Sequence, residues 1–382
     1  TIEMGNNQIS NISSLAGLEN LYDINFNNNK ISDISALAGK KELVYLKLAG
    51  NQIQDISLLA DCPALSIIDF TKNKITDISA LKGNNNLGYL YMADNRVVSL
   101  TGLEDAKNLK EVHMDRNNIQ DISALKLLTK LKIVDMDNNA IGDISALSNS
   151  VLLEQVSFEN NRIKDISIIG KSYESLEYLN CNNNLISDIS ALSNCSALKG
   201  IELSKNKITD IGALSGLREL IAIDLSYNAI ESCDALSECP SLKAIDLSHN
   251  RISDINGLSN LTAGGTDGAL DLSSNNITDI SPLPSVYTYH ALMLYSNPIK
   301  DYAHLKDLAG SGLGVSDSNT NNSEIYALSK FKLYYFVDIP LDRQQKLVVG
   351  LNTLTSSPYE FLTTEEADKE IDDYLSGNYF KK

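Results

Sequence analysis

The sequence predicts an α/β repeat fold, a right-handed curved solenoid with a parallel β-sheet on its concave face and 3-10 or irregular segments on its convex side. A phrase of Asn, any residue, an aliphatic residue and then Asp-Ile-Ser recurs almost every 22 residues along the 382-residue chain. A period of about 20 to 29 residues is typical of units that bury their apolar side only by stacking on one another. The recurring asparagines are Asn7, Asn29, Asn51, Asn73, Asn95, Asn117, Asn139, Asn161, Asn184, Asn206, Asn228, Asn250, Asn275 and Asn297.

Aliphatic residues lead into each of these asparagines at alternating positions. Leu43, Leu46 and Leu48 precede Asn51 in this way. Such alternation predicts a short strand with one buried face. The isoleucines two and five residues after each Asn extend the same buried set around the bend, so we expect them in the core.

Two polar positions of the repeat have structural interpretations. The Asn amide offers two donors and an acceptor, so we expect it to satisfy backbone groups of the turns as a ladder along the stack. An Asp follows four residues later in eleven of the fourteen units, as at Asp33 and Asp55. We expect it to accept an N–H at the start of a short helical turn, and a calcium-binding edge is the alternative.

Composition narrows the functional class. Hydrophobic residues make up 43% of the chain and charged residues 21%, and no apolar run approaches the roughly 18 residues of a membrane-spanning helix. A net charge of −17 argues against a nucleic-acid partner and favours a protein partner. Five cysteines lack metal-ligand or disulfide-framework spacing, so we expect buried free thiols at Cys62, Cys181, Cys195, Cys233 and Cys239.

The residues between the inward leucines form the exposed face of the predicted sheet, where a binding site would lie. Aromatic, aliphatic and charged side chains gather there in repeats three to nine, and aromatic anchors with a charged rim are typical of protein interfaces. Repeats ten to thirteen carry a blander series of acidic residues and serines. The predicted protein-binding residues are Tyr45, Ile67, Asp69, Tyr89, Tyr91, Glu111, His113, Asp135 and Tyr178.

Catalysis and metal binding are weaker interpretations of the same face. His113 beside Asp135 has the residue types of a general-base pair or a cation site. An open, water-filled face gives little desolvation to tune those groups. Metalloprotease, P-loop, dinucleotide and nucleophile-elbow motifs do not occur in the sequence. We therefore expect no catalytic residues, no metal and no cofactor.

The 22-residue period ends near residue 305, so we expect a solenoid over 1–305 and a C-terminal capping segment over 306–382. That segment reads as a loop, a strand over 331–339 and short helices over 342–351 and 363–375. A small partner-binding or dimerising module is the alternative. Because the chain opens inside a repeat, we also expect a cap or an export signal to precede Thr1.

The unit NKITDISAL at 73–81, with close copies at Asn29 and Asn206, resembles the 22-residue leucine-rich repeats of the bacterial internalin family. The resemblance covers roughly residues 1–305. It implies an exported bacterial surface protein that binds a host protein with its concave face, often through aromatic residues. The matching positions are Tyr45, Tyr89, Tyr91, His113 and Tyr178.

These observations favour a monomeric, non-enzymatic protein-recognition scaffold at the cell surface or outside the cell. Two alternatives remain open. Eukaryotic regulators of protein phosphatase are built from similar repeats, so a cytoplasmic regulator or a secreted effector could use the repeats as a docking platform. A purely structural surface protein would bind nothing tightly.

Overall fold

The structure is a computed structural model that describes residues 1–172, 174–262, 269–284, 291–294, 296–299 and 304. The chain divides into two compact units, Thr1–Cys195 and Ser196–Lys382, which we describe separately. The capping segment expected over 306–382 lies outside the described residues. No helix in the described ranges is both long enough and apolar enough to cross a bilayer.

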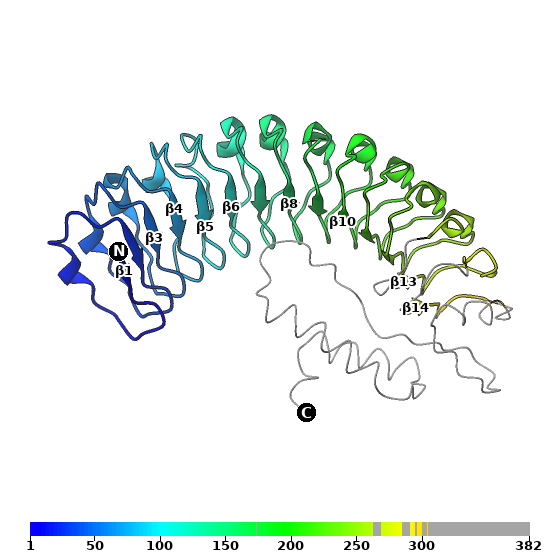
Figure 1. Ribbon diagram of the computed structural model, residues 1–382, viewed down its shortest axis with the longest axis horizontal. Helices are drawn as coiled ribbons and strands as arrows, with labels where there is room; N and C mark the ends of the chain where they lie inside the picture. The colour runs from blue at the N-terminus through cyan, green and yellow to red at the C-terminus, as the bar shows by residue number, and fades with distance from the viewer. Residues whose placement is uncertain (173, 263–268, 285–290, 295, 300–303, 305–382) are drawn as a thin grey trace, which may run out of the picture. The chain divides into compact units, whose positions relative to one another are not determined.

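In the first unit every strand pairs in parallel with the next strand of the chain (Figure 1). Each strand is only two or three residues long, because the chain must bend within each 22-residue coil. The all-parallel sheet confirms the predicted fold class. The strands are β1 Ile2–Glu3, β2 Asp23–Asn25, β3 Tyr45–Lys47, β4 Ile67–Asp69, β5 Tyr89–Tyr91, β6 Glu111–His113, β7 Ile133–Asp135, β8 Gln155–Ser157 and β9 Tyr178–Asn180.

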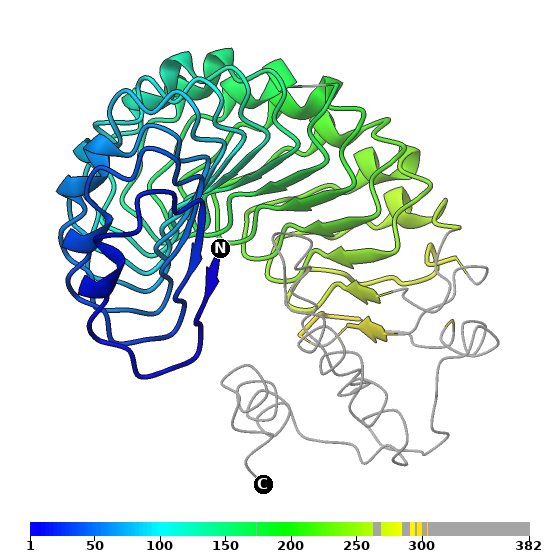
Figure 2. The same ribbon diagram turned by 60° about the vertical axis from the view of Figure 1, so that its left-hand side comes forward.

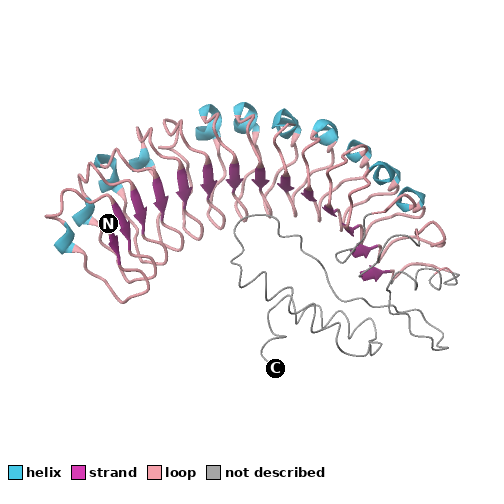
Figure 3. Cartoon of the chain, in the orientation of Figure 1, coloured by secondary structure: helices cyan, strands magenta, loops and turns pink. Residues whose placement is uncertain are grey.

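Short 3-10 helices line the side of the first unit opposite its strands (Figure 3). Their tight turns let one coil of chain return from the outer side to the sheet in few residues. They are η1 Ser13–Leu15, η2 Ser35–Leu37, η3 Ser57–Asp61, η4 Ser79–Leu81, η5 Ser123–Leu127, η6 Ser145–Asn149, η7 Ser167–Ser172 and η8 Ser190–Asn194.

The second unit repeats this plan, with parallel strands on one side and 3-10 helices on the other (Figure 2). Its strands are β10 Gly200–Glu202, β11 Ala222–Asp224, β12 Ala244–Asp246, β13 Ala269–Asp271 and β14 Ala291–Met293. Its helices are η9 Gly212–Leu214, η10 Asp234–Glu238 and η11 Asn256–Leu258.

The core of each unit is built from the predicted aliphatic positions. Leu46, Ile68, Leu90 and Val112 occupy the middle of successive strands in register and are fully buried. Stacking therefore removes each coil's apolar face from water only when both neighbours are present. All five cysteines are buried and form no disulfide, as predicted, and burial raises the pKa of the Cys195 thiol to about 11.

The asparagine ladder is confirmed in atomic detail. The Asn117 amide nitrogen donates to Met92 O of the preceding coil at 2.9 Å and to Met114 O of its own coil at 3.0 Å. Its Oδ1 accepts the N–H of Val97 at 2.8 Å. Asn117 is 7% exposed, so these backbone groups would otherwise be buried without partners. The ladder therefore ties each coil to the coil before it.

The recurrent aspartates accept the backbone N–H at the start of each 3-10 turn, as predicted. Asp33 Oδ1 takes the N–H of Ser35 at 2.8 Å, and this bond lowers the pKa of Asp33. Where the Asp is missing, another oxygen replaces it, as Asn11 does for Ser13 at 2.8 Å.

The coil after Asn95 has no 3-10 helix between β5 and β6 in the described chain. Gly102 has a φ of +109° there, and a Cβ at this residue would lie 2.7 Å from Ile78 O. Only glycine combines this backbone conformation with so close an approach to the neighbouring coil.

Candidate functional site

The predicted binding residues lie on the face of the strands that points away from the core, which we call the strand face. Parallel pairing sets equal positions of neighbouring strands side by side, about 4.8 Å apart. The register joins Tyr45 with Ile67, Ile67 with Tyr89, and Tyr89 with Glu111. It also joins Asp69 with Tyr91, which in turn lies beside His113.

Three consecutive strands, β3 to β5, present Tyr45, Ile67 and Tyr89, which we call the apolar row. All three side chains are partly exposed. Tyr22 packs edge-on against Tyr45 at a centroid distance of 5.4 Å, and Lys110 Nζ lies 5.9 Å from the centre of the Tyr89 ring. An apolar row on an otherwise polar sheet surface is suited to contact a partner.

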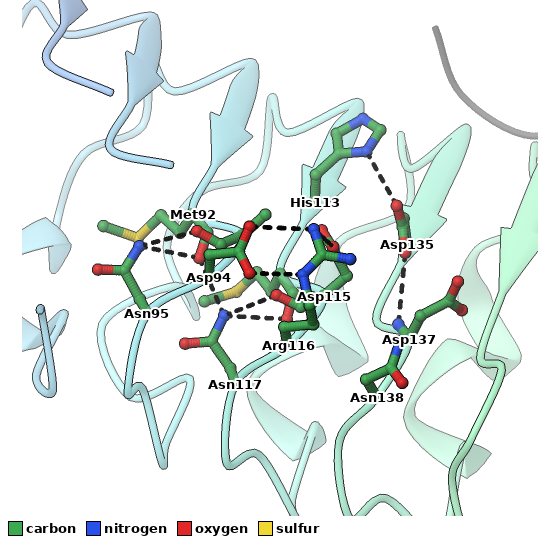
Figure 4. Close-up of polar contacts among 12 residues, drawn as sticks. Met92, Asp94, Asn95, His113, Asp115, Arg116, Asn117, Asp135, Asp137 and Asn138 are labelled. Atoms are coloured by element: carbon green, nitrogen blue, oxygen red, sulfur yellow. Dashed lines mark hydrogen bonds and ion pairs between the residues drawn. The ribbon is translucent and has the colours of Figure 1, made fainter. Parts of the chain in front are cut away.

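A polar network adjoins the apolar row at Tyr91. The Tyr91 hydroxyl donates to Glu111 Oε2 at 3.1 Å, and His113 Nε2 lies 3.8 Å from the same oxygen. The rings of Tyr91 and His113 stack with centroids 4.9 Å apart and an interplanar angle of 15°. His113 Nδ1 lies 3.7 Å from Asp135 Oδ2 (Figure 4). These four side chains therefore constrain one another across β5 to β7.

The expectation of an open, water-filled face is wrong at His113, which is only 6% exposed. Adjacent strands bring Tyr91 and Asp135 against its ring and exclude water from it. Burial lowers the pKa of His113, but Asp135 and Glu111 more than offset burial and raise the pKa to about 9. The imidazole is therefore positively charged at neutral pH.

Carboxylates accumulate beyond His113 on β6 to β8 and in the turns that follow. We call Asp115, Asp135, Asp137 and Glu159 the acidic group. Burial, then the charge of Asp135, raises the pKa of Asp115 to about 6, although the Arg116 guanidinium lies 2.6 Å from it. Burial and the same charge raise the pKa of Asp137 to about 8.

Asp137 and Glu159 of the acidic group accept hydrogen bonds from uncharged donors. The Ser157 hydroxyl and the Glu159 N–H each donate to Asp137 Oδ1 at 2.6 Å. Glu159 accepts from the amides of Asn160 and Asn180 at 3.2 and 3.4 Å. These bonds fix the carboxylates without neutralising them.

Tyr178 does not join the apolar row. It lies on β9 beside Gln155 of β8. Glu111, Ile133 and Gln155 occupy the equal positions between Tyr89 and Tyr178. Of the nine predicted residues, the structure brings eight together on β3 to β7 and places Tyr178 two strands further along.

The second unit holds a carboxylate series whose environment the sequence did not reveal. Glu202, Asp224, Asp246 and Asp271 occupy equal positions on β10 to β13. Glu202, Asp224 and Asp271 are buried, and burial together with the charges of Asp271 and Asp224 raises the pKa of Asp246 well above its ordinary value. A signal for this burial is present in the sequence: on each of the four strands the strand-face residues two positions before and after the carboxylate are small, Gly or Ala before it and Ser after it.

Neither carboxylate series forms a metal site: no group of three or more His, Cys, Asp or Glu side chains in the described part of the chain has suitable geometry. Parallel strands align the carboxylates in rows and do not make them converge on one point. The arrangement offers a broad surface of fixed charges beside apolar side chains.

Comparisons with known proteins agree with the repeat architecture. A family model described as Leucine Rich repeats (2 copies) matches residues 1–39, 41–83, 107–149, 152–194 and 218–260, which together exceed half of the chain. Further leucine-rich repeat models match 174–230 and 269–280. The chain belongs to the leucine-rich repeat family. No curated protein sequence matches it.

Internalins are among the solved structures that resemble this chain. The internalin InlF of Listeria monocytogenes is 29% identical with a TM-score of 0.71, and the match covers 77% of this chain and 86% of that one. InlJ of the same species is 20% identical with a TM-score of 0.66, covering 80% and 65%. The chain is thus an internalin-like leucine-rich repeat protein.

A plant receptor shares the fold at lower identity. The ectodomain of the Arabidopsis receptor kinase HAESA, solved with an IDA peptide hormone, is 23% identical with a TM-score of 0.68. The match covers 78% of this chain and 54% of that one, so this chain spans about half of the receptor ectodomain.

Proposed function

We propose that this protein is a non-enzymatic recognition scaffold whose first unit binds a protein partner on the strand face of β3 to β7. The observation that carries the proposal is the apolar row of Tyr45, Ile67 and Tyr89, which stands in register beside a fixed polar network. Rigid aromatic anchors with a polar rim lose little entropy on binding, which makes them effective hot spots.

Comparisons support a binding role and an extracellular setting. The HAESA ectodomain was solved with a peptide hormone, and an internalin stands among the structural likenesses. These likenesses support our proposal that the protein acts at the surface of a bacterial cell or in its surroundings. A cytoplasmic regulator with the same docking face is the second candidate, and the presence of all five cysteines as buried thiols without disulfides favours it because such thiols suit a reducing compartment.

The test is a capture experiment with the purified protein on beads and extracts of candidate host cells. Replacing Ile67→Ala together with Tyr89→Ala removes two neighbouring anchors of the apolar row. We expect recovery of the captured partner to fall by about tenfold or more, as hot-spot truncation costs roughly 2 kcal/mol. Unchanged recovery would remove the apolar row from the interface.

A matched control removes apolar surface elsewhere. Leu127 and Val151 are 59% and 51% exposed and lie at and after the outer helices η5 and η6. The pair Leu127→Ala and Val151→Ala deletes a comparable apolar area away from the strand face, and we expect it to leave capture intact.

A further inference from the structure

Resting on the proposed function, we propose that the partner of the strand face presents a cationic side chain, arginine or lysine, next to the apolar group that contacts Tyr45, Ile67 and Tyr89. The apolar row fixes where the partner docks. The chemistry of the strands beside it fixes what charge the partner must carry.

The apolar row ends at an acidic surface. Beyond Tyr89 the next strand places Glu111 at the equal position, and the acidic group follows at the end of β7 and in the segments after β6, β7 and β8. Tyr89, Glu111, Ile133 and Gln155 occupy equal positions on four neighbouring strands. At a strand spacing of about 4.8 Å, the distance from Tyr89 to Gln155 is roughly 14 Å. One short segment of a partner can therefore cover both surfaces.

The charges of this surface are not balanced within the unit. His113 contacts Asp135 and Glu111, and Arg116 contacts Asp115 and Asp94. No cationic side chain in the described residues makes an ion pair with Asp137 or Glu159. Both receive hydrogen bonds only from neutral groups. A cationic group of the partner would supply a countercharge for Glu159 and would favour the ionised form of Asp137.

Burial increases the effect of that countercharge. Charges in a partly dehydrated site interact more strongly than charges in bulk water. The raised pKa of Asp137, about 8, means that this carboxyl is mostly protonated at pH 7. An approaching cation lowers that pKa, so binding releases a proton at pH 7. Binding should therefore strengthen as the pH rises from 6 to 9.

The test uses three synthetic peptides of equal length and equal apolar content, with arginine, glutamine or glutamate at the same alternate positions. Each is titrated calorimetrically into the full chain at pH 7, in phosphate and in Tris. We expect the arginine peptide to bind about tenfold tighter than the glutamine peptide and to lose affinity in high salt. Its binding heat should differ between the two buffers because a proton is released.

Two double variants test whether Asp137 and Glu159 are the residues that bind the arginine peptide. Asp137→Asn with Glu159→Gln removes both carboxylates. The new amide oxygen at position 137 can still accept from Ser157 and from the residue 159 N–H, and the one at position 159 can accept from one of the Asn160 and Asn180 amides. We expect this double variant to weaken the arginine peptide by about tenfold and to abolish the buffer dependence of the heat. Glu19→Gln with Glu42→Gln removes two exposed charges away from the strand face and should change neither.

Three results would overturn the cation inference: equal affinity for the arginine and glutamine peptides, an equal loss in both variant pairs, or no peptide binding at all. None of these results by itself refutes the proposed function, which other results decide. If the glutamine peptide binds in a Tyr89-dependent manner, the strand face binds a partner without the predicted charge. If no peptide binds, the capture experiment with Ile67→Ala and Tyr89→Ala decides.

Discussion

The rings of Tyr91 and His113 stack across β5 and β6 at 4.9 Å, and Glu111 contacts both side chains. This contact couples an aromatic residue of the proposed interface to a charged imidazole. The Tyr91 ring is therefore held by its hydrogen bond to Glu111 and by its contact with the His113 ring.

We expect His113 to contribute a pH-dependent part of the folding free energy. Its folded pKa of about 9 exceeds the ordinary 6.5, so the contribution is complete below pH 6.5 and is lost as the pH rises through about 9. The loss should be on the order of 1–3 kcal/mol, and His113→Gln should flatten this part of the profile. Urea unfolding between pH 6 and 9 measures the free energy. NMR chemical shifts of the His113 ring carbons report the protonation of the imidazole. A titration midpoint below pH 7 would refute the raised pKa.

The ladder asparagines should be far less tolerant of substitution than their neighbours. Asn117→Ala removes an amide that makes hydrogen bonds with four backbone groups of two coils, and the cost should be about 2–4 kcal/mol because these groups stay buried. Asn118→Ala, one residue away, changes an exposed side chain and is the control. Thermal unfolding compares the two, and equal melting temperatures would count against a structural role for the ladder.

Asp246→Asn should raise the melting temperature at pH 7. Burial and the charges of Asp271 and Asp224 raise the pKa of Asp246, so ionisation opposes folding. Stability from this residue is present below its unfolded pKa near 4 and is lost as the pH rises. The gain should therefore shrink towards pH 4. Asp246 Oδ1 accepts the Ser248 N–H at 2.9 Å, and the amide oxygen of the variant can accept the same bond. Glu219→Gln, which replaces an exposed side chain, is the control. No gain at pH 7 would contradict the unfavourable ionisation assigned to Asp246.

Much of the fold followed from periodicity alone. The spacing of Leu46 and Leu48 before Asn51 fixed which side chains are buried, because a strand alternates and a coil of constant length keeps every strand in register. The roles of Asn117 and Asp33 followed from the hydrogen-bonding capacity of their side chains. These properties are local, so the sequence states them directly.

The candidate site was predicted less completely. Equal positions within successive repeats predicted that Tyr89, Tyr91 and His113 lie close together, and the strand register agrees. Burial of His113 was not predicted, because it depends on how closely the Tyr91 ring and Asp135 approach in three dimensions. Electrostatic environment is a collective property of several strands, which one repeat does not encode.

Departures from the 22-residue step leave the ladder unchanged. Asn184 follows a coil with one extra residue, yet it still donates to Phe158 O at 2.8 Å and accepts the Ile163 N–H at 2.9 Å. Asn275 follows a coil with three extra residues and keeps the bond to Leu247 O at 2.9 Å. Insertions are thus absorbed in the return segment between strands. An engineer could graft peptides into those segments, or excise whole coils, and still preserve the alignment of the remaining strands.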